Sequence, residues 1–175
     1  MIPLDMLSGA IHKTKYGNLE VIEYINKNSV LIRFQNTNYT TTARSSNIRR
    51  DKVKDPYSPS VHGVGYLGVG EAIADTREYK LWANMLRRCY CPITHSYSPT
   101  YKDCTVSEEW HNFQNFYKDL PKIPNYELWL NNRNYQLDKD IKVEGNKNYS
   151  LDSCLFVTSN ENVLNGIMKR ATIKH

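Results

Sequence analysis

The sequence lacks any apolar run of the length that a membrane-spanning helix needs, which is about 18 uncharged residues. Its first ten residues, Met1–Ala10, also lack the basic start and long apolar stretch of a signal peptide. Only four cysteines are present among 175 residues, too few for a disulfide scaffold. The composition excludes collagen, a coiled coil and full disorder. We therefore expect no membrane association and a cytoplasmic protein with reduced thiols.

Acidic residues are scarce in the first part of the chain. Residues 1–70 carry nine Lys and Arg against five Asp and Glu, whereas residues 71–175 carry 14 against 13. A basic excess of this kind suits a polyanionic partner. Much of it lies in a cluster that follows a predicted strand, and this cluster is interpreted either as a phosphate-contacting patch or as a solvated basic turn: Arg44, Arg49, Arg50, Lys52 and Lys54.

The first part of the chain has the alternation of apolar and polar residues that is typical of β-strands. Residues 18–47 are rich in β-branched and aromatic types, and two Asn-rich breaks, at 26–28 and 36–38, suit hairpin turns. We predict a small antiparallel sheet or barrel as a basic β-module over residues 1–55. Residues 56–74, rich in Pro and Gly, are predicted to be a linker or a long ordered loop.

Two amphipathic helices are predicted next, at the start of a domain covering residues 75–175. Asp75 is a suitable N-cap for a helix that runs to about Tyr90, and a second helix is expected from Ser107 to Leu120, where Pro121 stops it. Aromatic and apolar side chains recur at helical spacing along both segments, so we expect the two helices to pack face to face. The residues expected in this core are Trp82, Met85, Trp110, Phe113 and Phe116.

The last block, about residues 135–170, is predicted to be a hairpin followed by a helix. We expect a strand over Tyr135–Ile141, a turn over Gly145–Asn148, a strand over Cys154–Val157 and a helix that begins after Thr158 or Ser159. This order can bring an acid on the first strand opposite a polar side chain on the helix, across a gap where one divalent ion fits. Hard oxygen ligands of this kind suit Mg²⁺ or Mn²⁺.

This block resembles the ββα-metal motif of HNH endonucleases, in the variety common among phage-encoded homing-type enzymes. The run Val157-Thr158-x-x-Glu161-Asn162-x-x-Asn165 is similar to the start of the family's helix, and Gly145-Asn-x-x-Tyr149-Ser-x-x-x-Cys154 is similar to its loop and second strand. The aromatic helical segments over residues 79–90 and 109–116 resemble the region that precedes this motif in many phage relatives. The resemblance covers about residues 75–170 and implies an α+β fold: an N-terminal antiparallel sheet or barrel, a helical region and a ββα-metal unit.

The resemblance also assigns roles to individual residues. Asp138 matches the strand carboxylate that binds the metal, and Asn162 matches the helix residue that completes the site. The catalytic His of the family is replaced by Lys139, and its structural Asn falls at Ser153. A lysine is normally protonated at neutral pH and cannot accept a proton. Catalysis would then use Asp140 to orient water.

Several alternatives stay open at this stage. The base could instead be a histidine from elsewhere, such as His95 or His111, or metal-bound hydroxide could act alone. Arg87 and Arg88 could extend the DNA-contacting surface. If the protein is phage-encoded, as the resemblance suggests, it would act in the cytoplasm of the host cell. The cysteines fit a zinc site poorly, because Cys89-x-Cys91 lacks the usual two-residue spacing. The first hypothesis is a Mg²⁺- or Mn²⁺-dependent endonuclease or nicking enzyme that acts on double-stranded DNA. The alternative is an inactive HNH-like phage protein that binds DNA or a host defence protein, and a protein partner for the N-terminal sheet is a third possibility.

Overall fold

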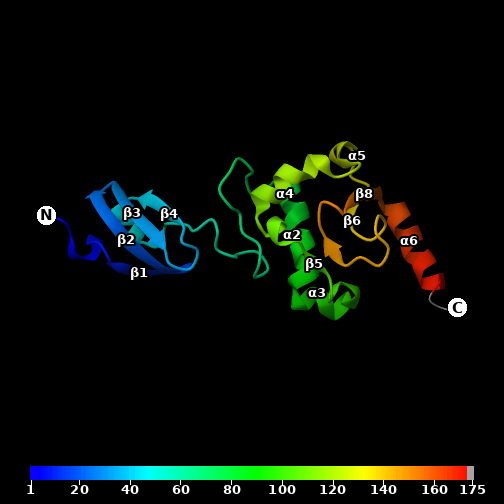
Figure 1. Cartoon of the computed structure of the whole chain (residues 1–175), viewed down its shortest axis with the longest axis horizontal. Coiled ribbons are helices and arrows are strands. Elements are labelled where there is room, and N and C mark those ends of the chain that lie inside the picture. The colour runs from blue at the N-terminus through cyan, green and yellow to red at the C-terminus, as the bar shows by residue number, and fades with distance from the viewer. Residues whose placement is uncertain (173–175) are drawn as a thin grey trace. The chain divides into compact units, whose positions relative to one another are not determined.

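The computed structural model describes the backbone of residues 1–172 and the side chains of residues 1–168. The predicted C-terminal domain extends to residue 175, so its last three residues lie outside the described part. The chain divides into two compact units, Met1–Ser58 and Pro59–His175, and each is described by itself. Together they form an α+β protein (Figure 1). Within residues 1–172, no helix has the length and apolar composition needed to cross a membrane.

The first unit is an open four-stranded antiparallel sheet in the order β1-β2-β3-β4. The sheet is preceded by a short 3₁₀ turn and followed by the helix α1; its elements are η1 (Leu4–Met6), β1 (Ile11–Thr14), β2 (Gly17–Asn26), β3 (Ser29–Phe34), β4 (Thr40–Ala43) and α1 (Ser45–Arg49). Both predicted hairpin turns are confirmed, since β2 pairs with β3 and β3 with β4. The predicted antiparallel sheet is confirmed, whereas the alternative of a barrel is wrong. Its closure would need β1 to pair with β4, but these four-residue strands form the two outer edges of the sheet.

One face of this sheet forms the core of the first unit. Alternate residues of β2 and β3 are fully buried, as the period-two pattern requires, and Met6 and Ile48 cover them from the flanking segments. The edge-to-face contact between Tyr16 and Phe34, with ring centroids 6.1 Å apart, extends this core. Ile48 lies on α1, so this core also anchors the helix that carries Arg49.

The second unit combines helices with two small two-stranded sheets. Its elements are α2 (Arg77–Tyr90), α3 (Pro92–Tyr97), η2 (Pro99–Tyr101), β5 (Thr105–Val106), η3 (Glu108–His111), α4 (Phe113–Asp119), η4 (Leu120–Lys122), α5 (Tyr126–Asn131), β6 (Tyr135–Asp138), β7 (Asn148–Tyr149), β8 (Leu155–Thr158) and α6 (Ser159–Thr172). The expected face-to-face contact of two helices is confirmed, because the rings of Trp82 on α2 and Phe113 on α4 lie 5.2 Å apart. All five residues predicted for this core are buried.

Two helix boundaries differ from the prediction for local reasons. Asp75 has a left-handed backbone (φ 70°), so it does not cap α2; Thr76 does, by accepting a hydrogen bond from the Tyr79 N–H. The single helix expected from Ser107 to Leu120 is instead a 3₁₀ turn and a shorter α-helix. The break is at Asn112, whose backbone is extended and whose side chain caps α4 by accepting from the Gln114 N–H at 3.0 Å.

The Pro/Gly-rich segment after residue 58 is an ordered loop on the second unit. Tyr66 pairs with Asn112 in an isolated bridge, and the Gln114 side chain donates to the carbonyls of Leu67 and Ala72 at 3.0 and 2.8 Å. Gly68, with φ +72°, approaches the Asn112 side chain too closely for any Cβ atom. The glycines therefore allow this loop to lie directly against α4.

Candidate functional site

The candidate site is built on a strand, a long loop, a second strand and a helix. β6 pairs with β8 in antiparallel register, with Asp138 opposite Leu155, and α6 begins directly after β8 (Figure 1). Thr158 and Glu161 form a capping box: the Thr158 N–H donates to Glu161 Oε2 at 2.8 Å, and the Glu161 N–H donates to Thr158 Oγ1 at 3.2 Å. Asn162 therefore occupies the first turn of α6, next to the strand that ends at Asp138.

Asp138 ends β6 and turns the chain into the loop. Its Oδ1 atom accepts hydrogen bonds from the backbone N–H groups of Asp140 and Ile141, both at 2.8 Å, so β6 stops at residue 138 and does not reach Ile141 as predicted. The side chain is buried, with 7% of the residue exposed. Within residues 1–168, its second oxygen, Oδ2, has no hydrogen-bond partner. One oxygen thus holds the turn and the other is available to a ligand.

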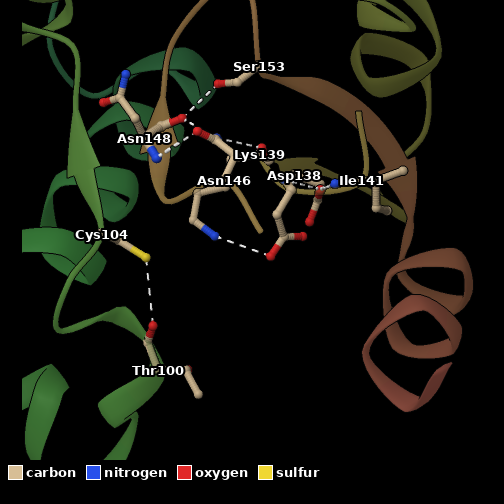
Figure 2. A network of polar contacts seen from close by, with 9 residues as sticks. Thr100, Cys104, Asp138, Lys139, Ile141, Asn146, Asn148 and Ser153 are labelled. Carbon is tan, nitrogen blue, oxygen red and sulfur yellow. Dashed lines mark hydrogen bonds and ion pairs between the residues drawn. The ribbon is translucent and has the colours of Figure 1, made fainter. Parts of the chain in front are cut away.

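The loop between β6 and β8 is held by side-chain amide and hydroxyl groups (Figure 2). Asn146 Nδ2 donates to the carbonyls of Lys139 and Asn148 at 2.8 and 2.6 Å, and Ser153 Oγ donates to the same Asn148 carbonyl at 2.7 Å. Ser153 was expected only as a replacement for a structural amide. Asn146 was not predicted as a functional residue, although its place directly after Gly145 (φ +73°) marks a turn where an Asn side chain often binds the backbone.

The loop is also tied to a distant segment of the chain. β7 pairs with β5 in parallel register, with Thr105 opposite Asn148 and Val106 opposite Tyr149. The predicted turn over 145–148 thus leads into a strand whose partner lies between α3 and α4. This pairing places the loop, with Tyr149, against the helical core.

A cavity of about 200 Å³ lies between these elements. It brings together five residues proposed from the sequence, namely Arg88, Asp138, Lys139, Asp140 and Asn162. The rest of its lining comes from η2, β6, β7 and α6: Thr100, Tyr101, Gln136, Leu137, Tyr149, Asn165 and Gly166. The Asn162 amide is half-buried and makes no hydrogen bond to the described residues. Both groups expected to bind a metal ion therefore face one space.

Lys139 occupies the position of the family's catalytic histidine. Only 8% of the residue is exposed, and its Nζ lies 3.5 Å from Asp140 Oδ2 and 5.5 Å from the centre of the Tyr149 ring. Burial raises the pKa of the nearby Cys104 thiol, and the Lys139 ammonium opposes that rise. A carboxylate and the face of an aromatic ring both stabilise a cation. Lys139 can thus donate hydrogen bonds and positive charge to a ligand.

Arg88 brings a second cation to the cavity. Its guanidinium lies 5.8 Å from the centre of the Tyr101 ring, and Arg88 lines the cavity together with Tyr149. Burial raises the pKa of Tyr149, and Arg88 opposes that rise. No carboxylate of the described residues lies within 4.0 Å of the guanidinium of Arg88. A half-buried arginine is normally paired with an anion, so this arrangement suits an anionic ligand.

The other predicted residues lie outside this cavity. His95 Nε2 is 2.9 Å from the Arg88 carbonyl, and His111 Nε2 is 3.3 Å from the Tyr90 hydroxyl, so neither histidine of the sequence-based alternative lines the cavity. Arg87 is exposed on α2. The pKa of His62 is lowered mainly by desolvation of its imidazole and further by the positive charge of Arg87.

The basic cluster belongs to the first unit. Arg49 forms a two-bond ion pair with Asp5, at 2.6 and 2.9 Å, which lowers the pKa of that carboxyl group. Arg44, Arg50, Lys52 and Lys54 are exposed and have no ion-pair partner among the described residues. Four cations of the cluster therefore face solvent, and Arg49 also holds the segment that contains η1.

No family model, curated protein or solved structure matches this chain. Within residues 1–168, no group of three or more His, Cys, Asp or Glu side chains is arranged to hold a metal ion. A metal site of the kind that the resemblance implies would have Asp138 as its carboxylate ligand and Asn162 as an amide ligand, and both residues line the cavity. Mg²⁺ is often bound in this way, by one or two protein groups together with water and substrate phosphate.

Proposed function

We propose that the protein is a metal-dependent endonuclease or nicking enzyme of HNH type that hydrolyses phosphodiester bonds in double-stranded DNA in the cytoplasm. The observation that supports this most directly is the cavity at the end of β6, which gathers Asp138, Asn162 and Arg88. The order of strand, loop, strand and helix supports it further.

Asp138 and Asn162 are the residues that would hold one Mg²⁺ or Mn²⁺ ion. The Oδ2 atom of Asp138 is oriented by the two backbone hydrogen bonds to Oδ1, and the Asn162 amide oxygen adds a neutral hard ligand. The bound ion would stabilise the charge that develops on the leaving oxygen of the phosphodiester. Arg88, which also lines the cavity, would bind the phosphate.

Lys139 and Asp140 have distinct parts in this proposal. The Lys139 ammonium donates to the anionic phosphate and supplies charge rather than acting as a base. Asp140 orients the attacking water. The exposed cations of the first unit, Arg44, Arg50 and Lys52, with Arg87 on the second unit, contact backbone phosphates and supply sequence-independent affinity.

One observation favours a second function on the same scaffold. A buried ammonium lines the space that the metal ion would share, and a neighbouring cation disfavours metal binding. In this alternative the protein is an inactive HNH-like protein that binds DNA, or a host defence protein, without cleaving it.

Nicking of supercoiled plasmid DNA tests the proposal, with Asp138→Asn as the decisive variant. An Asn side chain keeps an oxygen that accepts from the Asp140 and Ile141 N–H groups, so the turn is retained while the ligand charge is lost. We expect Mg²⁺-dependent nicking to fall about 100-fold or more, because a metal ion contributes several kcal/mol to the transition state. Equal nicking by this variant would remove Asp138 from the metal site.

Two further measurements separate the enzyme from the inactive alternative. Titration calorimetry with Mn²⁺ should show binding to the wild type and none to Asp138→Asn. If the wild type neither binds the ion nor nicks DNA, the inactive protein is the better description. In that case Lys139→His tests whether the remainder of the site is intact: the change removes the ammonium and adds a base, so a gain of nicking would show that Lys139 alone had blocked activity.

A further inference from the structure

A second basic hollow lies on the same unit, outside the cavity of the candidate site. Its volume is about 510 Å³. It is formed where α2 faces α5 and the start of β6, and it is lined by Arg77, Lys80, Leu81, Asn84, Trp129, Arg133 and Tyr135. Three of these residues are cations and none is an acid, which distinguishes this hollow from the cavity with its two aspartates.

The hollow and the cavity follow one another along the same two elements. Arg77, Leu81, Asn84 and Arg88 are spaced by four, three and four residues, so they lie on one face of α2. The first three line the hollow and Arg88 lines the cavity. On β6, Tyr135 lines the hollow and the residues that follow it line the cavity. Eleven residues of helix span about 16 Å from Arg77 to Arg88.

Arg77 is held rigidly. Its guanidinium donates to the carbonyls of Leu130 and Asn132 at 2.9 and 3.3 Å and lies 4.1 Å from the centre of the Trp129 ring. Within the described residues, no carboxylate lies within 4.0 Å of it. Because Arg77 covers the face of the indole ring, Trp129 is not available to stack on a base. The chemistry of the hollow is therefore that of an anion site rather than a base-reading site.

The other two cations are exposed. Lys80 Nζ lies 3.0 Å from Asp75, but their side chains are 66% and 89% exposed, so water and salt screen this pair strongly. Arg133 is exposed and has no ion-pair partner in the described part of the chain. Both side chains can therefore exchange their present surroundings for a phosphate at little cost.

We propose that this hollow binds the phosphodiester backbone of the DNA whose scissile bond lies in the cavity. The inference rests on the proposed function, and it adds Arg77, Lys80, Asn84 and Arg133 as contacts to flanking phosphates. Duplex DNA rises 3.4 Å per nucleotide of each strand, so about 16 Å along α2 corresponds to about five nucleotides. A polyanion with regularly spaced charges fits cations placed along one helix face.

The test is DNA binding by the double variant Lys80→Ala/Arg133→Ala, which leaves the structural Arg77 in place. Fluorescence anisotropy with a 20-base-pair duplex, without divalent ions, gives the dissociation constant over a series of salt concentrations. Loss of two phosphate contacts should lower the slope of log K against log salt by about 2. We also expect affinity at low salt to fall about tenfold.

The matched control is Lys118→Ala/Lys122→Ala, which removes the same charge from the same unit. Lys122 is paired with Asp119 at 2.7 Å, as Lys80 is with Asp75, and Lys118 is exposed like Arg133. The proposal is overturned if the two double variants have the same slope. It is also overturned if poly-glutamate loses affinity in Lys80→Ala/Arg133→Ala relative to the wild type while the duplex, at equal charge concentration, does not, since an acidic protein would then be the ligand.

Failure of this proposal is distinguishable from failure of the nuclease assignment. Asp138→Asn should retain the wild-type slope, because the measurement requires no ion and no cleavage. A reduced slope in Lys80→Ala/Arg133→Ala together with an inactive wild type would support the hollow and remove only the enzyme.

Discussion

Replacing Asn146 by Ala should destabilise the second unit markedly, although the residue is not apolar and lies on a loop. The change removes the two hydrogen bonds from Nδ2 to the carbonyls of Lys139 and Asn148, at 2.8 and 2.6 Å, and a longer one of 3.3 Å from the Asn148 N–H to Oδ1. At about 0.5–1.5 kcal/mol for each bond, and with carbonyls left partly buried, we expect a loss of about 2–3 kcal/mol.

Tryptophan fluorescence during urea unfolding measures this loss selectively. All three tryptophans, Trp82, Trp110 and Trp129, belong to the unit that starts at Pro59, so the first unit does not contribute to the signal. With a slope of about 1–3 kcal/mol per molar urea, the transition midpoint should fall by about 1–2 M.

The matched control is Asn131→Ala, which removes a single exposed hydrogen bond to the Glu127 carbonyl at 2.8 Å. We expect this variant to stay within about 0.5 kcal/mol of the wild type. Asn146→Asp should resemble Asn146→Ala, because a carboxylate cannot donate to the two carbonyls. The reasoning is refuted if Asn146→Ala unfolds at the same midpoint as Asn131→Ala.

Two further predictions concern titratable groups. Burial acts to raise the pKa of Asp119, but hydrogen bonds from Lys122 and Trp110 outweigh it and hold the pKa below its usual 3.8. A carboxyl group whose pKa is lower in the folded than in the unfolded protein stabilises the fold at pH values above its unfolded pKa, and this stabilisation is lost as the pH falls through its folded pKa. The difference in unfolding midpoint between the wild type and Asp119→Asn should therefore shrink below about pH 4. For the thiols, the pKa of the half-buried Cys91 is lowered by hydrogen bonds from Thr94, so a thiol reagent should label this residue first and the native protein should show one fast thiol. The remaining thiols, Cys89, Cys104 and Cys154, are buried, and burial raises the pKa of Cys89 and of Cys154 to about 12. Labelling of two or more thiols at the same fast rate would contradict this burial.

The parts of the fold that follow from local patterns could be predicted from the sequence. Alternation and Asn-rich turns indicated the N-terminal hairpins, and the final strands and helix were expected within a few residues of where they lie. The convergence of Asp138 and Asn162 follows from the same local order. Each of these features depends on residues close to one another in the chain.

The remaining features depend on distant contacts, which no local pattern reveals. The break at Asn112 is accompanied by its bridge to Tyr66, and the sheet stays open because its short edge strands do not meet. Asn146 holds the loop by donating to the Lys139 carbonyl, seven residues earlier in the chain. The conformation of the loop that brings these two groups together cannot be read from its sequence. The hollow beside α2 needs cations that are 56 positions apart in the sequence, Arg77 and Arg133, to face the same space.

The parallel pairing of β5 with β7 has a consequence for engineering. A peptide cut out from Tyr135 onwards would contain Asp138 and Asn162 but would lose Thr105 and Val106, the partners of Asn148 and Tyr149. Grafting that fragment onto another scaffold, or exchanging it between homologues, should therefore fail unless the short segment between the helices is transferred with it. The smallest unit that could be transferred therefore consists of two separate stretches of the chain, one that contains Thr105 and Val106 and one that begins at Tyr135.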